Sequence, residues 1–138
     1  MRILRRLSAA IALCTLTACL FGRAPSTTTD SGLRYRTLIT GSGPIARVGQ
    51  RVRVHQTTSL LSGKKLFSTH SNGTPLSFVI GANREIAGID EGVRGMQVGE
   101  KRLLTVPPHL SRRSSYPPNT PADSTLFIEV ELLEIRRR

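Results

Sequence analysis

The sequence predicts an α+β domain in which a bent antiparallel β-sheet wraps on one short α-helix. Two observations carry this prediction. Between Leu33 and Ile135 the dominant hydrophobic period is two, which is typical of strands with one buried face. Only Ile86–Arg94 has its apolar residues at helical spacing. Strands that bury one face against a single helix form two packed layers around one core.

Six segments are predicted to be strands. In chain order they are Leu33–Leu38, Arg51–Thr57, Lys65–Ser68, Leu76–Ile80, Lys101–Val106 and Thr125–Ile135. Turn residues such as Gly41-Ser42-Gly43-Pro44 and Ser62-Gly63 separate them. The second segment alternates cleanly, which places Val52, Val54 and Gln56 on one face. The last segment is the longest, and one of its faces consists of Leu126, Ile128, Val130 and Leu132.

The helix is predicted to bury Ile86, Ile89 and Val93 and to expose Asp90 and Glu91. Gly95 is expected to end it, because glycine is common just after the last helical residue. Asp90 and Glu91 resemble a catalytic carboxylate pair only in sequence. Adjacent helix positions do not face each other, and acidic residues in a first turn complement the helix dipole, so we interpret both as structural.

The N-terminus predicts export. Arg2, Arg5 and Arg6 precede the apolar run Leu7–Leu16, which is too short to span a membrane and suits a secretory signal. Leu16-Thr17-Ala18-Cys19 resembles the bacterial lipobox, which predicts cleavage before Cys19 and lipidation of its sulfur. The alternatives are an ordinary signal with a chance cysteine and an uncleaved anchor.

This interpretation divides the chain into three parts. Residues 1–18 form the signal peptide, residues 19–31 form the lipidated N-terminus and a flexible linker rich in Ser, Thr and Pro, and residues 32–138 form one domain. The mature protein is expected in the cell envelope, as a membrane-anchored lipoprotein facing the periplasm or the exterior. Cys14 is lost with the signal and Cys19 is acylated, so no disulfide is expected.

The composition is strongly basic, with a formal net charge of +11. A nucleic-acid partner is not expected, because the positive residues are scattered and no aromatic platform lies among them. The charge fits attraction to anionic lipid head groups or envelope polymers, or simply a well-solvated surface.

The order of these elements, together with five local motifs, resembles the FKBP-type peptidyl-prolyl cis-trans isomerases. The motifs are Val54-His55, Gly63-Lys64-Lys65, Pro75-Leu76-Ser77-Phe78 with Gly81, Gly88-Ile89-Asp90-Glu91-Gly92-Val93 followed by Gly95-Met96-Gln97-Val98-Gly99-Glu100-Lys101-Arg102, and Thr125-Leu126 through Val130-Glu131-Leu132-Leu133. Each motif alone is weak, but together they extend over the whole domain in the family's order and spacing.

The resemblance implies an apolar pocket that acts on proline-containing polypeptides without a cofactor, a metal or a covalent step. Its catalytic positions fall on Phe78, Ile86, Ile89 and Ile128. Its substrate-binding positions fall on Gln56, Leu66, Phe67, Leu76, Glu85, Arg112 and Tyr116. Ile89 holds the pocket floor, where well-known family members have Trp, and the backbone N–H of Ile86 would donate to a substrate carbonyl. His55 is expected on the outer face of a strand, His70 in a hairpin loop and His109 just after Pro107-Pro108. The three histidines share no metal-ligand spacing, so no metal site is predicted.

Several of these positions depart from the family pattern. Gln56 replaces a usual Tyr, Leu66 a usual Phe and Leu76 a common Phe. Phe67 replaces an Asp that makes a polar contact at the pocket edge, and Arg112 replaces a Tyr that donates its hydroxyl, a role that the nearby Tyr116 could take over.

We therefore expect an isomerase that assists the folding of exported proteins, with activity reduced by the loss of pocket aromatics. The alternative is a non-catalytic peptide-binding or scaffold lipoprotein on the same fold, which these departures favour. A monomer is the default expectation, since no dimerisation helix is apparent.

Overall fold

The computed structural model describes residues 24–112 and 120–136 of the 138-residue chain. Its elements in chain order are β1 (Thr27–Thr28), β2 (Arg34–Ile39), β3 (Arg51–Ser59), β4 (Lys65–Ser68), α1 (Thr69–Asn72), β5 (Leu76–Val79), α2 (Ala87–Val93), β6 (Lys101–Val106), the 3₁₀ turn η1 (Pro108–Leu110) and β7 (Leu126–Arg136). Strands β4 and β6 coincide with the prediction, and the other predicted strands are confirmed to within two residues at either end.

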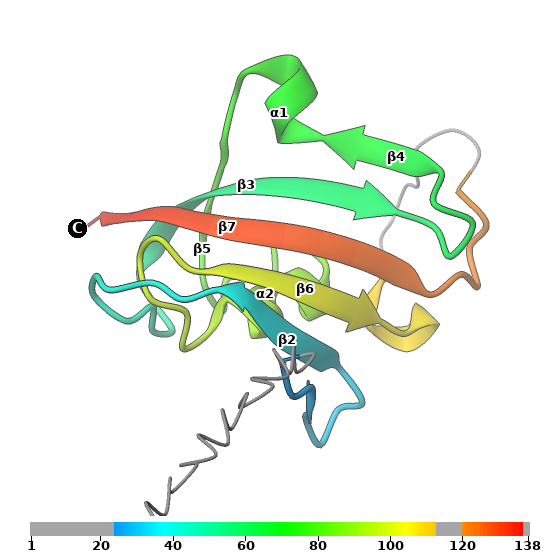
Figure 1. The fold of residues 1–138 in the computed structure, drawn as a ribbon, viewed down its shortest axis with the longest axis horizontal. Helices are drawn as coiled ribbons and strands as arrows, with labels where there is room; N and C mark the ends of the chain where they lie inside the picture. The colour runs from blue at the N-terminus through cyan, green and yellow to red at the C-terminus, as the bar shows by residue number, and fades with distance from the viewer. Residues whose placement is uncertain (1–23, 113–119, 137–138) are drawn as a thin grey trace, which may run out of the picture.

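The strands form one antiparallel sheet in the order β1-β2-β6-β7-β3-β4, and β5 pairs with β3 beside this path (Figure 1). One edge of strand β3 therefore pairs with two different strands along its length. Its first half, Arg51–Val54, pairs with β5, and its last residues, Thr57–Ser59, pair with β4. The predicted α+β class, an antiparallel sheet with one short helix packed on it, is confirmed, and α1 adds a single further turn.

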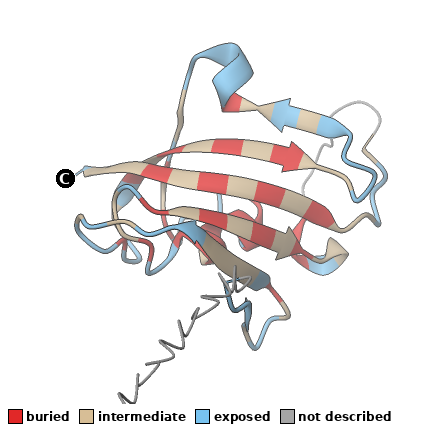
Figure 2. Ribbon diagram, in the orientation of Figure 1, coloured by how far each residue is buried: buried red, intermediate tan, exposed pale blue. Residues whose placement is uncertain are grey.

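Burial alternates residue by residue along β3, β6 and β7, as Figure 2 shows. One face of the sheet, the inner face, carries the buried side chains, and the opposite, outer face carries the half-buried and exposed ones. On β3 the inner face continues beyond Gln56 to Thr58, which is 7% exposed. The alternation confirms the period of two on which the strand predictions depend.

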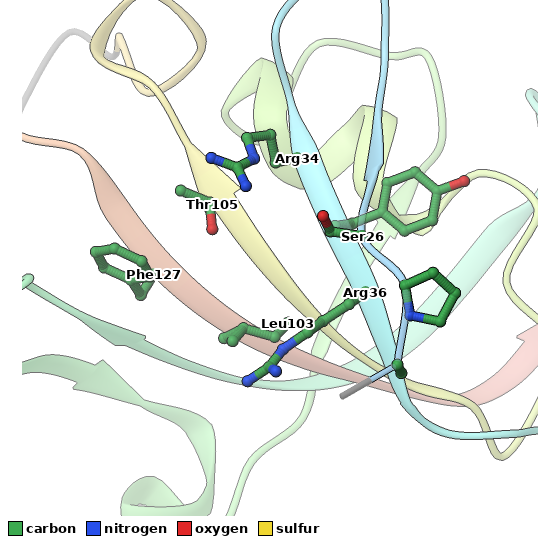
Figure 3. A pocket seen from close by; sticks show the side chains of 9 residues that line it. Ser26, Arg34, Arg36, Leu103, Thr105 and Phe127 are labelled. Carbon is green, nitrogen blue, oxygen red and sulfur yellow. The ribbon is translucent and has the colours of Figure 1, made fainter. Parts of the chain in front are cut away.

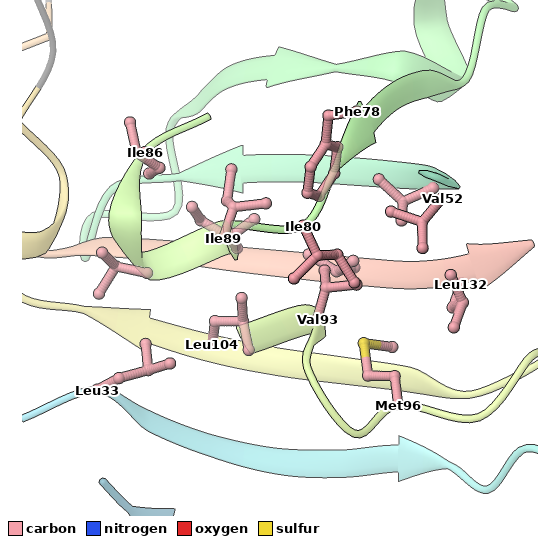
Figure 4. Close-up of a cluster of buried hydrophobic side chains, with 14 of the residues drawn as sticks. Leu33, Val52, Phe78, Ile80, Ile86, Ile89, Val93, Met96, Leu104 and Leu132 are labelled. Atoms are coloured by element: carbon pink, nitrogen blue, oxygen red, sulfur yellow. The ribbon is translucent and has the colours of Figure 1, made fainter. Parts of the chain in front are cut away.

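Helix α2 lies against β6 and β7 on the inner face, and its apolar side chains enter the core (Figure 4). Two glycines permit this close approach. A Cβ atom added to Gly88 would lie 2.4 Å from Val106 Cγ1, and one added to Gly92 would lie 2.4 Å from Leu104 Cδ1. Because neither distance is sterically possible, the two glycines set how near α2 can come to β6.

A buried ion pair holds the end of α2 to the sheet. Arg102 donates to Glu100 Oε1 at 2.6 Å and to the carbonyl oxygens of Gly92, Arg94 and Gly95 at 3.1–3.3 Å. Its guanidinium also lies 4.6 Å from the centroid of the Tyr35 ring. The arginine thus satisfies carbonyl groups that a helix end leaves without intrahelical partners.

The prediction that Asp90 and Glu91 are exposed is wrong, since the Asp90 side chain is buried (5% exposed) and Glu91 is half-buried. Asp90 accepts a hydrogen bond from the N–H of Gly81 at 2.7 Å and an ion pair from Arg94 at 2.6 Å. These two partners compensate the burial of its charge. Its structural role is as predicted, because it ties the segment before the helix to the helix itself.

Two further expectations are corrected. Residues 24–31 were expected to belong to a flexible linker, but Thr27 and Thr28 pair with β2 as strand β1, and Ser31 donates to Glu91. The folded part therefore begins before Gly32. His70 was expected in a hairpin loop, but it lies in α1. Within residues 24–112 and 120–136, no helix is long and apolar enough to cross a membrane.

Candidate functional site

The candidate site lies on the inner face, where the start of α2 meets β3, β5 and β7. Three residues of the site are aligned across neighbouring strands by the pairing of the sheet. Thr58 on β3 is paired with Ile128 on β7 and with Phe67 on β4, so the three side chains share one face. Ile128 is fully buried and Phe67 is 37% exposed, so the row runs from the core to the rim.

A β-bulge in β4 supplies a second apolar side chain beside this row. Ser59 is paired with Lys65 and Thr58 with Phe67, which leaves Leu66 between them without a direct partner. Bulges re-aim side chains in this way. Leu66 is half-buried and packs against the core, and so does Leu76, which stands opposite Val54.

The floor of the site is continuous with the hydrophobic core. Figure 4 shows Ile89, at the start of α2, between Ile86 and Phe78, and all three side chains are at most 4% exposed. Ile86 precedes the helix in an extended conformation, and its carbonyl oxygen accepts from the N–H groups of Ile89 and Asp90. Among the described residues, no hydrogen bond has the Ile86 N–H as its donor, which leaves this group available to a ligand.

Gln56 places an amide within this apolar surface. Its side chain is 5% exposed, and its Oε1 atom is buried without a hydrogen-bond partner among the described residues. Its backbone is fixed by Thr69, whose hydroxyl accepts from the Gln56 N–H at 2.9 Å and donates to the Gln56 carbonyl oxygen at 3.3 Å. A rigid strand therefore holds an unsatisfied acceptor at the edge of the site.

The comparisons with known proteins decide the family. A family model for the FKBP-type peptidyl-prolyl cis-trans isomerase matches residues 43–133, which include every strand and helix from β3 to Leu133 of β7. The chain belongs to this family. The order of elements is thus that of an FKBP domain.

Three similar proteins show how far the match extends. The human peptidyl-prolyl cis-trans isomerase FKBP10 is 45% identical over 87 residues, which is 63% of this chain and 15% of FKBP10. FK506-binding protein 1A of Neurospora crassa is 44% identical over 91 residues, 65% of this chain and 76% of that protein. The crystal structure of FkpA from Escherichia coli superposes with a TM-score of 0.71 at 32% identity, covering 80% of this chain and 51% of FkpA. The chain therefore spans only a small part of FKBP10 and about half of FkpA.

Most of the residues predicted for the FKBP pocket meet at this site, namely Gln56, Leu66, Phe67, Leu76, Phe78, Ile86, Ile89 and Ile128. Glu85 is half-buried beside Ile86, and Arg112 is exposed just after η1. Tyr116 and Cys19 lie outside the described residues. Sequence reasoning missed Thr58, although the alternation of β3 includes it, and it missed Thr69, for which the sequence carries no signal.

Two of the three histidines are neighbours in the structure, although they are far apart in the sequence. The rings of His55 and His70 stack with centroids 4.1 Å apart, and His55 Nδ1 lies 2.9 Å from Thr69 Oγ1. Within the part of the chain that the structure describes, no three His, Cys, Asp or Glu side chains gather as a metal site would require. The stacked pair lies beside the Thr69 contact that fixes β3 and does not line the site.

Proposed function

We propose that this FKBP domain is a peptidyl-prolyl cis-trans isomerase that assists the folding of exported proteins through its apolar inner-face pocket. The observation that carries the proposal is the combination, at one place, of the buried apolar floor of Phe78, Ile89 and Ile128 with the Ile86 N–H, which donates no hydrogen bond within the described residues. The similarity to relatives such as the peptidyl-prolyl cis-trans isomerase FKBP10 supports the same activity.

The chemistry follows from the prolyl peptide bond. Rotation must cross a barrier of about 18–20 kcal/mol, because conjugation is lost when the amide twists. The twisted amide is less polar than the planar one, so an apolar surface that excludes water favours it relative to bulk water. Ile89, Phe78 and Ile128 supply that surface, and the Ile86 N–H would hold a carbonyl group of the client. No step requires a general base or a nucleophile.

A second function, non-catalytic peptide binding, is favoured by one specific feature. The buried Oε1 of Gln56 is an acceptor without a partner among the described residues, and a peptide N–H would satisfy it. Binding that is equally strong in the planar and twisted states does not accelerate rotation. In this alternative Gln56 and Phe67 recognise a peptide without catalysing its isomerisation.

An isomerisation assay with substituted proteins separates the two functions. For an isomerase weakened by lost aromatics, Gln56→Tyr and Arg112→Tyr should each raise kcat/KM about two- to tenfold, which corresponds to about 0.5–1.5 kcal/mol of aromatic contact. Thr57→Tyr is the matched control, since Thr57 lies on the outer face of the same strand and its replacement should leave the rate unchanged. Rates equal to the uncatalysed one in all these proteins would refute the isomerase and favour peptide binding.

We also propose that Cys19 is the lipidated N-terminus of a membrane-anchored envelope protein. Support comes from the basic, apolar leader and Leu16-Thr17-Ala18-Cys19. Mass spectrometry of the mature protein should find acyl chains on Cys19, and Cys19→Ser should leave the chain soluble or unprocessed. An unmodified Cys19 in the mature wild-type protein would refute the anchor without affecting the isomerase proposal.

A further inference from the structure

A pocket lies on the outer face of the sheet, opposite the candidate site. It has a volume of about 410 Å³ and forms where residues 24–26 run beside β2. Figure 3 shows the side chains that line it from β2, β6 and β7, among them Arg34, Arg36, Leu103, Thr105 and Phe127. A pocket of this size suits a small ligand or a head group.

Two arginines give the pocket its charge. Arg34 and Arg36 lie two residues apart on β2, so their side chains share the outer face and start about 7 Å apart. Within residues 24–112 and 120–136 neither takes part in an ion pair. The outer-face carboxylates of β7 already have cationic partners, since Glu129 and Glu131 pair with Lys101, and Glu134 pairs with Arg53 and Arg136.

The floor between the arginines and β7 is partly apolar. Register places Arg34, Thr105 and Phe127 in one cross-strand row and Arg36 beside Leu103 in the next. Leu103 and Phe127 are half-buried, and Thr105 and Ser26, which carry hydroxyl groups, also line the pocket. Guanidinium groups bind phosphate oxygens with paired hydrogen bonds, and the apolar floor suits the carbon backbone that a head group carries.

We infer that this pocket binds the phosphate group of an anionic lipid and thereby docks the outer face of the sheet on the membrane surface. The course of the chain supports this occupant. Ala24 lines the pocket and follows Cys19 by five residues, a length that spans at most about 18 Å. A lipid on Cys19 would therefore keep the pocket close to the head groups. This proximity rests on the proposed anchor, whereas the chemistry of the pocket does not.

Vesicle binding by the full chain carrying Cys19→Ser tests the inference without an acyl anchor. This Cys19→Ser protein should bind vesicles of phosphatidylcholine mixed with phosphatidylglycerol more tightly than vesicles of phosphatidylcholine alone. Replacing both arginines, as Arg34→Gln/Arg36→Gln, should lower the partition coefficient on the mixed vesicles by about 25-fold, about fivefold for each charge. Added salt should weaken the wild-type interaction, because it screens exposed charges.

The matched control is Arg47→Gln/Arg51→Gln, which removes the same charge from exposed positions outside the pocket. A loss of binding to the mixed vesicles that is confined to the Arg34/Arg36 variant supports the pocket as the lipid-binding site. Equal losses in both variants would overturn it in favour of general charge attraction, and equal binding to the two vesicle types would assign the interaction to the apolar leader. Binding of soluble glycerol phosphate without binding to the mixed vesicles would also overturn it, since the pocket would then take a free phosphate. The two arginines lie outside the inner-face site, so isomerisation should not change, and each proposal can fail alone.

Discussion

Removing the guanidinium of Arg102 should destabilise the domain more than any surface charge would. Arg102 on β6 is 8% exposed, and it joins Glu100, the residue just before this strand, to three carbonyl oxygens at the end of α2. Glu100 depends on it in turn, although it also accepts from Thr37 Oγ1 at 3.0 Å and from the N–H of Gln97 at 2.9 Å. Arg102→Met keeps the aliphatic stem and deletes the polar contacts together with the contact of the guanidinium with the Tyr35 ring.

The expected loss in the free energy of unfolding is about 3–5 kcal/mol, because the substitution leaves the buried Glu100 carboxylate without its cation. Urea denaturation of the two proteins measures it. Lys101→Met is the matched control. Lys101 is the next residue on the same strand, its ion pairs with Glu129 and Glu131 are on the partly exposed outer face, and about 1 kcal/mol or less should be lost.

The double variant Glu100→Gln/Arg102→Met sharpens the test. If the ion pair is the cause, the two changes should cost less together than the sum of the single changes, with a coupling of about 0.5–3 kcal/mol. Amide hydrogen exchange of α2 should also accelerate in Arg102→Met, since the helix end loses its contacts with the sheet. This account of the buried ion pair would be refuted if the free energy of unfolding of Arg102→Met were within about 1 kcal/mol of the wild-type value, or if the losses of the two single variants were strictly additive.

Three other predictions follow from the packing and the surface charges. Gly92→Ala should cost about 1–3 kcal/mol, because its new Cβ would lie 2.4 Å from Leu104 Cδ1, and adding Leu104→Val should recover part of that loss in the same denaturation assay. Ile89→Ala and Phe78→Ala should each cost about 2–5 kcal/mol, while Leu61→Ala at an 84% exposed position should cost little, and wild-type midpoints for both core variants would disprove the placement of the core. The Arg136 side chain, which donates to Glu134, lowers the pKa of that carboxyl, with a smaller contribution from Arg53. The stabilisation it provides should be present above the ordinary Glu pKa and lost as the pH falls through the lowered one, and NMR titration should show a higher pKa in Arg136→Gln and an unchanged one in Arg47→Gln.

The sequence predicted the elements that repeat a simple pattern. Alternation placed Val52, Val54 and Gln56 on one face of β3, and helical spacing placed Ile89 in the core. Both signals are local, because a strand or helix with one buried face must repeat its apolar residues at the period of its backbone. The motif resemblance then joined these local elements into one FKBP site.

The features that sequence reasoning missed depend on contacts between distant residues. Asp90 is buried because the Gly81 N–H and Arg94 compensate its charge, and no local pattern distinguishes such a carboxylate from a solvated one. Thr69 fixes the backbone of Gln56 across thirteen positions of sequence. The outer pocket is similar, since it exists only because residues 24–26 run back along β2. The spacing of residues along the chain does not predict these long-range contacts.

The two sites on this domain are built from neighbouring residues of the same strands. On β7, Phe127 lines the outer pocket, and Ile128, the next residue, lies in the floor of the inner-face site. On β6, Leu103 lines the outer pocket, and Leu104, the next residue, is buried in the core on the inner face. Because successive side chains of a strand point to opposite faces, a lipid bound in the outer pocket would turn the inner-face site away from the membrane and toward clients. A single alternating pattern would then both form the prolyl pocket and orient it. Substitutions at these two neighbouring residues should therefore affect different measurements. Phe127→Ser should weaken vesicle binding, whereas Ile128→Ala should lower stability and the rate of isomerisation.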